Sequence, residues 1–341
     1  MAGTGERVEE WNEGIGVHEA RHCLLCGREG TWLHRGLRDR LFDVPGVWAL
    51  MRCPERHLAW LNPRPIVQDM GKLYERYFTH ADTADDGAGV DRLPPRGGVA
   101  RQVVKRGMQW GQALIGLEAE TARLSLMTLE DMSPGTLLDV GSADGRFLHK
   151  MREAGWQVVG VETDPQAVRV ARKRFAVTVH EGTLESAALR DGAFDAVTVS
   201  HVIEHVPDPI ATLRECARVL GPRGRVVVVT PNLGSLGHAA FGQACVHLDP
   251  PRHLQLFSAA GLRYCAERAG LHVRECRTTA RDARGIWAES RLIRRHGALP
   301  PNSPEKQRLR LRLEAQAFQI GEHCLTRAVD VGEEIVLVAT K

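Results

Sequence analysis

The stretch that most constrains the fold is residues 136–150, TLLDVGSADGRFLHK. A short apolar run leads into a turn of small residues, and apolar residues at helical spacing follow. This pattern predicts a strand, a tight turn and a helix. Gly141 and Gly145 can adopt backbone angles closed to other residues, and they let a ligand approach the main chain. Because a helix N-terminus presents free N–H groups and a partial positive charge, the turn favours an anionic ligand group.

The spacing of the small residues argues against a nicotinamide dinucleotide site. Such a site requires G-x-G-x-x-G, whereas here Asp139, Gly141, Ala143 and Gly145 follow one another at intervals of two. This row resembles motif I of class I S-adenosylmethionine (SAM) dependent methyltransferases, E/D-x-G-x-G-x-G, with Ala143 in place of the middle glycine. Taken alone, the same turn also fits an ordinary strand–helix connection. The resemblance implies that SAM contacts Asp139, Gly141, Ser142, Ala143, Asp144 and Gly145.

The next two strands add to this resemblance. The apolar run at 157–162 ends in Glu162, 21 residues after Gly141, and an acid at this distance can accept hydrogen bonds from both ribose hydroxyls of an adenosine ligand. Thr163 follows it directly. After the expected strand at 177–181, the family often has an aspartate near adenine. Gly182, Thr183 and Leu184 stand there instead, so backbone groups or Thr183 would have to serve.

Two later blocks point to the methyl acceptor. FDAVTVSHVIEHVPDP at 194–209 and HLDPPRHLQLFS at 247–258 resemble the small-molecule branch of the family. Since ligands of doubly wound sheets bind beyond the carboxyl ends of the strands, Ser200 and His201 should face donor and acceptor. His201, His247 and His253 are the candidate general bases, because histidine can take a proton near neutral pH. A base is needed only if the acceptor loses a proton.

The N-terminal part carries a metal-binding pattern, C-x2-C-x26-C-x3-H. Zinc requires four such ligands in a tetrahedron. The segment resembles the zinc ribbon at the start of many bacterial methyltransferases, although Arg56 takes the place of the fourth cysteine. His22 and His34 are alternative fourth ligands, and a ribbon that has lost its metal is the competing interpretation. The expected structural zinc site consists of Cys23, Cys26, Cys53 and His57.

The resemblance implies an α/β fold with a Rossmann-like, doubly wound, seven-stranded sheet, a small zinc-binding module and a helical cover. The last strand, 334–340, should run antiparallel between the fifth and sixth. We expect an N-terminal tail at 1–19, a zinc-ribbon-like module at 20–78, a linker and covering helix at 79–133, and the methyltransferase domain at 134–341. This domain includes a basic helical insertion at 281–330.

Two features near these boundaries have open interpretations. Residues 281–312 hold nine basic and three acidic residues, a local net charge of +6, which fits either a solvated helical pair or a lid that attracts an anionic acceptor. Tyr74, Tyr77 and Phe78 recur at helical spacing. Their side chains either pack in the interior or approach the site of the methyl donor.

Composition narrows the class of protein. With 43% hydrophobic and 26% charged residues the chain reads as a soluble globular protein, and a net charge of +3 is too small to imply nucleic-acid binding by itself. No signal peptide or membrane span is visible. Eight cysteines without an export signal favour a reducing, cytoplasmic setting.

The predicted function is methyl transfer from SAM to a small-molecule acceptor by in-line displacement. The acceptor could be a sugar, a lipid-linked molecule or a secondary metabolite, with an anionic group among the candidates. An RNA methyltransferase and a non-catalytic SAM-binding or interaction module remain as alternatives. The sequence predicts neither the methylated atom nor the oligomeric state.

Overall fold

The structure is a computed structural model that describes residues 9–12, 14–55, 58–74, 116–300, 303, 305 and 308–341, with side chains from residue 14 onward. Its centre is a seven-stranded sheet in the order β13-β14-β11-β10-β7-β8-β9. Strand β14 is antiparallel to β11 and β13, and the other neighbouring pairs are parallel. The predicted Rossmann-like fold with its antiparallel last strand is therefore confirmed. The strands are β7 (Thr136–Val140), β8 (Gln157–Glu162), β9 (Thr178–Glu181), β10 (Phe194–Ser200), β11 (Leu220–Pro231), β13 (His272–Thr279) and β14 (Glu334–Thr340).

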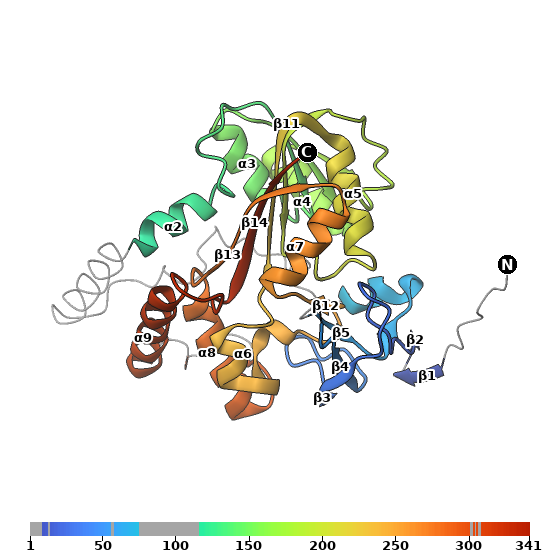
Figure 1. Ribbon diagram of the computed structural model, residues 1–341, viewed down its shortest axis with the longest axis vertical. Coiled ribbons are helices and arrows are strands. Elements are labelled where there is room, and N and C mark those ends of the chain that lie inside the picture. The colour runs from blue at the N-terminus through green and yellow to red at the C-terminus, as the bar shows by residue number, and fades with distance from the viewer. Residues whose placement is uncertain are drawn as a thin grey trace.

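Helices cover both faces of this sheet (Figure 1). Alternate residues of a strand point to opposite faces, so Leu138 and Val197 belong to one hydrophobic cluster and Leu137 and Ala196 to another. The first cluster includes residues of α5 and α7, and the second includes residues of α2 and α3. The helices are α2 (Leu117–Leu124), α3 (Arg146–Glu153), α4 (Pro165–Phe175), α5 (Pro209–Val219), α6 (Leu236–Phe241), α7 (Ala259–Arg268), α8 (Ala283–His296) and α9 (Leu309–Leu325), with 3-10 turns η1 (Val67–Tyr74), η3 (Gly242–Ala244) and η4 (Val246–Leu248).

Short polar residues cap the helices that follow the strands. Asp164 accepts a hydrogen bond from the backbone N–H of Gln166, and Ser258 accepts one from Gly261. Each side chain is an N-cap that satisfies a donor which the first turn of its helix leaves unpaired. The caps fix where α4 and α7 begin, and therefore where the strand ends open toward a ligand.

The N-terminal part is joined to the main sheet region through a shared strand. Its four-stranded sheet has the order β12-β5-β4-β3, and β12 (Gln255–Leu256) comes from the chain far beyond it. The other members are β3 (Thr31–Leu37), β4 (Trp48–Arg52) and β5 (Ala59–Leu61). A second small sheet pairs β1 (Glu9–Asn12), β2 (Ile15–His18) and β6 (Arg64–Pro65), of which β1 and β2 lie where we expected a tail.

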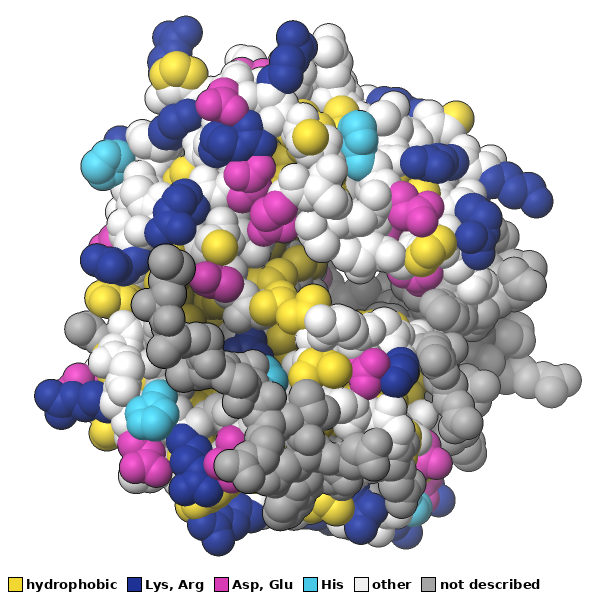
Figure 2. Space-filling view, turned by 90° about the vertical axis from the view of Figure 1, so that its right-hand side faces the viewer, with side chains coloured by type: hydrophobic (Ala, Val, Ile, Leu, Met, Phe, Trp, Pro, Cys, Tyr) yellow, Lys and Arg dark blue, Asp and Glu magenta, His cyan; other side chains and the backbone are white. Residues whose placement is uncertain are grey.

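Figure 2 shows hydrophobic side chains gathered in a hollow between the upper and the lower part of the face that it draws. In Figure 1 the upper part is the main sheet with its helices, and the lower right is the N-terminal part. Helices α6, α8 and α9 lie at the lower left, and α8 packs against both α6 and α9.

Several expectations fall on residues outside the description, namely His57, Tyr77, Phe78 and most of the linker at 79–133. Among the described residues, no helix has the length and the apolar character that crossing a membrane requires.

Candidate functional site

The glycine turn follows β7 at the carboxyl edge of the sheet. Gly141 has φ 74° and Gly145 has φ 80°, a left-handed conformation that favours glycine. A Cβ at Gly141 would come within 2.3 Å of Val202 Cγ2, and one at Gly145 within 2.8 Å of Ala171 Cβ. Ala143 has φ 45°, so the turn holds three left-handed residues within five positions. The main chain is thereby folded back tightly over the end of the sheet.

Glu162 lies against this turn. Its Oε2 accepts a hydrogen bond from the backbone N–H of Ala143 at 2.8 Å, and its Oε1 accepts one from Asp164 at 2.8 Å. The two sequence signals, the turn and the acid 21 residues later, therefore meet in space at the ends of β7 and β8. A ligand bound over the turn would have this carboxylate at its side.

Asp139 is the buried acid of the turn. Thr198 Oγ1 donates to its Oδ1 at 2.7 Å. Burial raises the pKa of Asp139 to about 7, with the Thr198 bond opposing and the charge of Glu162 adding to the rise. Asp139 is buried and bonded to Thr198, so it is better placed to stabilise the turn than to contact a ligand.

The remaining turn residues differ in exposure. Ser142 is buried, and its Oγ has no hydrogen-bond partner within the described part of the chain. An ideal Cβ on Gly160 would come 2.5 Å from this oxygen, so β8 must carry a glycine there. Asp144 is paired with Arg146 at 2.8 Å and lies at the start of α3.

The predicted adenine and ribose side of the site lies at the ends of β8 and β9. Thr163 donates weakly to Glu162 at 3.4 Å. Gly182 has φ 126° and donates its N–H to the carbonyl of Glu162 at 2.8 Å. Thr183 forms a local turn with Ser186, and Leu184 is buried in the hydrophobic core. All of these residues lie along the same edge as Glu162.

His201 follows β10 with φ 53°. Its Nε2 lies 2.7 Å from Glu334 Oε1 and its Nδ1 lies 3.5 Å from Glu204 Oε1. Burial alone would lower the pKa of His201, but the bonds to these two carboxylates and their charges raise it to about 10. At neutral pH both nitrogens are therefore protonated and directed at acids, an arrangement that disfavours His201 as a general base. Its side chain is still 38% exposed, so it borders the site as a cation.

The two partners of His201 are fully buried. Burial is the largest influence and would raise the pKa of both carboxyls, but the interaction with His201 and the charges of the surrounding basic side chains together outweigh it and lower the pKa of Glu204 and of Glu334 to about 2. Thr230 Oγ1 also donates to Glu204 at 2.8 Å. The sequence analysis missed Glu334, which lies 133 positions from His201, and no local signal could have identified it.

His253 has a defined tautomer. Its Nδ1 lies 2.8 Å from the carbonyl oxygen of His247. Since a carbonyl can only accept, Nδ1 carries a proton, and in the neutral ring Nε2 is therefore the nitrogen that has the lone pair. The ring packs edge-to-face against His205 with centroids 4.7 Å apart, and Nε2 lies 3.8 Å from Asp249 Oδ2. Of the three candidate bases, His253 is the one whose ring is oriented by a hydrogen bond to a backbone carbonyl within the described residues.

His247 lies in a more buried environment. Burial lowers its pKa to about 3, although the charge of Glu334 opposes this, and its Nδ1 lies 3.8 Å from Glu333 Oε2. Two further acids, Glu322 and Glu333, are nearby and buried, and burial raises their pKa to about 10 and about 7. The chain thus brings the predicted histidines together with buried acids that the sequence did not reveal.

Three groups of side chains have the spacing of metal ligands. In the N-terminal part Cys23, Cys26 and Cys53 have their sulfurs within 4.8 Å of one another, and those of Cys26 and Cys53 are 3.5 Å apart. Tetrahedral zinc with bonds of about 2.3 Å would hold sulfurs roughly 3.8 Å apart, so the triad fits. The other two groups lie beside the sheet edge. They are Glu204, His205 and His253, and His201, Asp282 and Glu334.

The alternative fourth ligands do not join the cysteines among the described residues. His34 Nε2 lies 2.8 Å from His238 Nε2, and His22 is not part of the group with metal-ligand spacing that the three cysteines form in the described part of the chain. The backbone N–H of Leu25 points to Cys23 Sγ at 3.4 Å, as in a turn that presents a thiolate.

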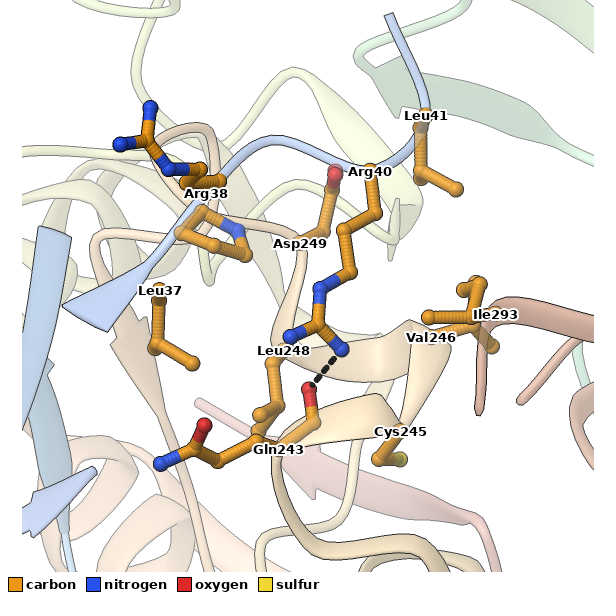
Figure 3. A pocket seen from close by; sticks show the side chains of 11 residues that line it. Leu37, Arg38, Arg40, Leu41, Gln243, Cys245, Val246, Leu248, Asp249 and Ile293 are labelled. Atoms are coloured by element: carbon orange, nitrogen blue, oxygen red, sulfur yellow. Dashed lines mark hydrogen bonds between the residues drawn. The ribbon is translucent and has the colours of Figure 1, made fainter. Parts of the chain in front are cut away.

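A separate small pocket lies where the N-terminal part meets the segment 243–250 (Figure 3). Arg40 crosses it and donates to the carbonyl of Gln243 at 2.8 Å. None of the predicted SAM-binding residues lines this pocket, so we do not connect it with the donor site.

Residues 113–275 match the family profile described as a methyltransferase domain. This part of the chain is a class I SAM-dependent methyltransferase domain. The domain contains the glycine turn, Glu162 and all three candidate histidines, so the recognition made from the motifs is confirmed. The nicotinamide alternative is excluded for it.

Curated relatives resemble only part of the chain. The ubiquinone biosynthesis O-methyltransferase of Xanthomonas oryzae pv. oryzae (strain PXO99A) is 38% identical over 108 residues, 30% of this chain and 45% of the relative. That of Xanthomonas axonopodis pv. citri is 36% identical over 124 residues, 35% of this chain and 49% of the relative. The chain thus spans about half the length of the curated relatives it matches.

Solved structures resemble the methyltransferase domain at lower identity. A SAM-dependent methyltransferase from Archaeoglobus fulgidus is 21% identical, with a TM-score of 0.44 over 66% of this chain and 94% of that one. One from Mesorhizobium loti is 15% identical, with a TM-score of 0.43 over 66% and 100%.

Proposed function

We propose that the protein transfers a methyl group from SAM to a hydroxyl oxygen of a small molecule. The observation that carries the proposal is the contact between Glu162 and the main chain of the glycine turn, because it combines an anion-favouring helix start with an acid suited to ribose. The curated relatives described above are O-methyltransferases, which favours oxygen as the acceptor atom.

SAM would lie across the carboxyl ends of β7 and β8. Its carboxylate would meet the N–H groups of the turn and of the start of α3, and Glu162 would take the ribose hydroxyls. Gly182, Thr183 and Leu184 would border adenine, and Ser200 and His201 the methyl group. Asp139, Ser142, Asp144 and Thr163 would shape the turn and its borders.

The chemical step is an in-line displacement. The acceptor oxygen forms a bond to the methyl carbon while the sulfur–methyl bond breaks, and its electron pair stays on sulfur to give neutral S-adenosylhomocysteine. The hydroxyl proton passes to a base, for which we propose His253, since the hydrogen bond from its Nδ1 to the carbonyl of His247 leaves Nε2 as the ring nitrogen that can accept a proton. Alignment of the two reactants would supply most of the acceleration, about 7–11 kcal/mol in well-oriented cases.

The basic insertion gives little support to an anionic acceptor. Its arginines are mostly paired on the surface, Arg291 and Arg310 with Glu314, and Arg295 and Arg308 with Glu305. Exposed pairs of this kind are screened and neutralise one another. We therefore propose a neutral hydroxylated molecule as the acceptor.

We also propose that Cys23, Cys26, Cys53 and His57 hold a structural zinc ion. Burial raises the pKa of the Cys23 thiol to about 12, and a cation beside it would reverse that rise. Metal analysis of protein purified without chelator should find about one zinc per chain. Cys53→Ser should lose it, whereas Cys324→Ser, at an exposed cysteine, should keep it. A metal-free wild type would refute the zinc proposal.

Two measurements test the function. Calorimetry should detect SAM binding, and a panel of neutral hydroxylated aromatics such as catechol and 4-methylcatechol should raise the rate of S-adenosylhomocysteine formation. SAM binding without turnover on any acceptor would favour the non-catalytic module. Binding of RNA at low salt that weakens steeply with added salt would favour the RNA methyltransferase.

A further inference from the structure

Two segments carry the candidate acceptor-side histidines, and both contact the N-terminal part of the chain. Residues 201–206 follow β10, and residues 247–257 lead into α7. The contacts are of three kinds. They are a buried ion cluster around Arg252, hydrogen bonds of the Gln255 side-chain amide, and the pairing of two strands. None of them was expected from the sequence.

The ion cluster centres on Arg252, whose side chain is 0% exposed. Its Nη1 and Nη2 donate to the two carboxylate oxygens of Asp39 at 2.7 and 2.9 Å, and its Nε donates to Asp249 at 3.0 Å. The guanidinium also lies 4.6 Å from the ring centre of Phe42. A buried, bidentate pair of this kind fixes both the distance and the orientation between the guanidinium and the carboxylate.

Asp39 is itself held rigidly. It accepts hydrogen bonds from the backbone N–H groups of Leu41, Phe42 and Val44 at 2.8, 3.1 and 3.0 Å. Because its oxygens are oriented by the main chain, Asp39 is a preformed receptor for the guanidinium. The position of Arg252 is thus set by Asp39 of the N-terminal part together with Asp249 of its own loop.

Gln255 links the two segments to the same part of the chain. Its Nε2 donates to the carbonyls of Ile203 and Val206 at 3.0 and 2.6 Å, and its Oε1 accepts from Arg64 at 2.9 Å. The backbone N–H of Leu254 donates to the carbonyl of Glu204 at 2.8 Å. One side chain therefore ties the loop after β10 to the loop before α7.

The strand pairing completes the connection. Gln255 pairs with Trp60 and Leu256 with Ala59 in an antiparallel ladder. Tyr74 adds a further contact, since its hydroxyl lies 3.0 Å from His205 Nδ1. The loops are therefore anchored along their length by β5, by the loop at Asp39 and by η1.

We propose that the N-terminal part is a positioning element of the acceptor site, and that Asp39, acting through Arg252, sets the placement of the loop that carries His253. The inference rests on the proposed function for its kinetic consequence, but the loop placement itself can be measured without any acceptor. A misplacement of about 1 Å at a reacting group can cost on the order of 100-fold in rate.

The test compares Asp39→Asn with Leu129→Ala. The first removes one charge of the buried cluster while keeping its shape. The second truncates a buried side chain of the hydrophobic cluster that packs on α2 and α3, and so serves as a control for lost stability. Hydrogen–deuterium exchange of the proteins, calorimetry with SAM, and kcat and KM with catechol are measured for both.

In Asp39→Asn, exchange at 247–257 should accelerate about tenfold or more, exchange at 141–145 should stay as in the wild type, and SAM affinity should change less than about twofold. With catechol, kcat should fall about 10- to 100-fold, and Leu129→Ala should show neither change. Unaltered exchange at 247–257, or the same acceleration in Leu129→Ala, would overturn the inference. Because exchange needs no acceptor, a wild type that methylates nothing would refute the proposed function alone.

Discussion

Gly141→Ala is the substitution for which the structure gives the clearest expectation. At φ 74° an alanine is in a conformation that costs an L-residue about 1–2 kcal/mol. Its Cβ would also lie 2.3 Å from Val202 Cγ2, a separation at which something must move. Forced packing of this kind costs about 1–3 kcal/mol. The variant should therefore lose about 2–5 kcal/mol of unfolding free energy, a large share of the about 5–15 kcal/mol of a typical domain.

Gly192→Ala separates the two contributions. Gly192 has φ 65°, and a Cβ there would meet nothing within 4 Å, so this variant should lose only the conformational part, about 1–2 kcal/mol. Val202→Ala, alone and combined with Gly141→Ala, completes a double-mutant cycle. The combination should recover the contact part, because it removes the atom that the new Cβ meets.

The assay is urea unfolding of the four variants and the wild type, followed by calorimetry with SAM. Displacement of the turn would remove main-chain hydrogen bonds to the carboxylate of SAM, each worth about 1.5–3 kcal/mol, so Gly141→Ala should bind SAM at least about tenfold more weakly. If Gly141→Ala is no less stable than Gly192→Ala and binds SAM like the wild type, the turn does not have the role that we assign to it.

Three further expectations follow from the same site. Glu162→Gln should weaken SAM binding about 10- to 100-fold, because a charged hydrogen bond contributes about 1.5–3 kcal/mol. The control is Glu181→Gln, at the residue of β9 that pairs with Glu162, and it should leave SAM affinity unchanged. Equal affinities of the two variants in calorimetry would contradict the ribose role. His253→Gln should lower kcat about 10²- to 10⁴-fold with SAM affinity unchanged, and an unaltered kcat would exclude it as the base. For His201, the folded-state pKa of about 10 lies above the unfolded value of 6.5, so its stabilising contribution is complete below pH 6.5 and is lost as the pH rises through 10. Unfolding free energies should therefore show that His201→Gln costs most near pH 6 and progressively less toward pH 10, and a cost that grows with pH would contradict the ion triad.

The site could be predicted only where its residues are close in sequence or follow a strand. The turn at 141–145 and Glu162 meet because β7 and β8 are adjacent parallel strands, and adjacent strands of this kind end at one edge. By the same argument the sequence located His201, which follows β10. It could not show that His201 is a cation held by Glu334, since the predicted place of the last strand does not decide which of its side chains reaches past β11 to His201.

The sequence by itself determined the local elements of this protein: the glycine turn, the capped helices and the order of strands that make the methyltransferase domain. These arise from steric limits on φ, from hydrogen bonding at helix ends and from alternating hydrophobicity, all of which act over a few residues. Only the tertiary structure decided that β12 joins the N-terminal sheet and that Arg252 lies against Asp39, 213 positions away. Contacts of this kind form because burial forces distant charged groups to find partners, and which partner is within reach depends on the complete packing of the chain.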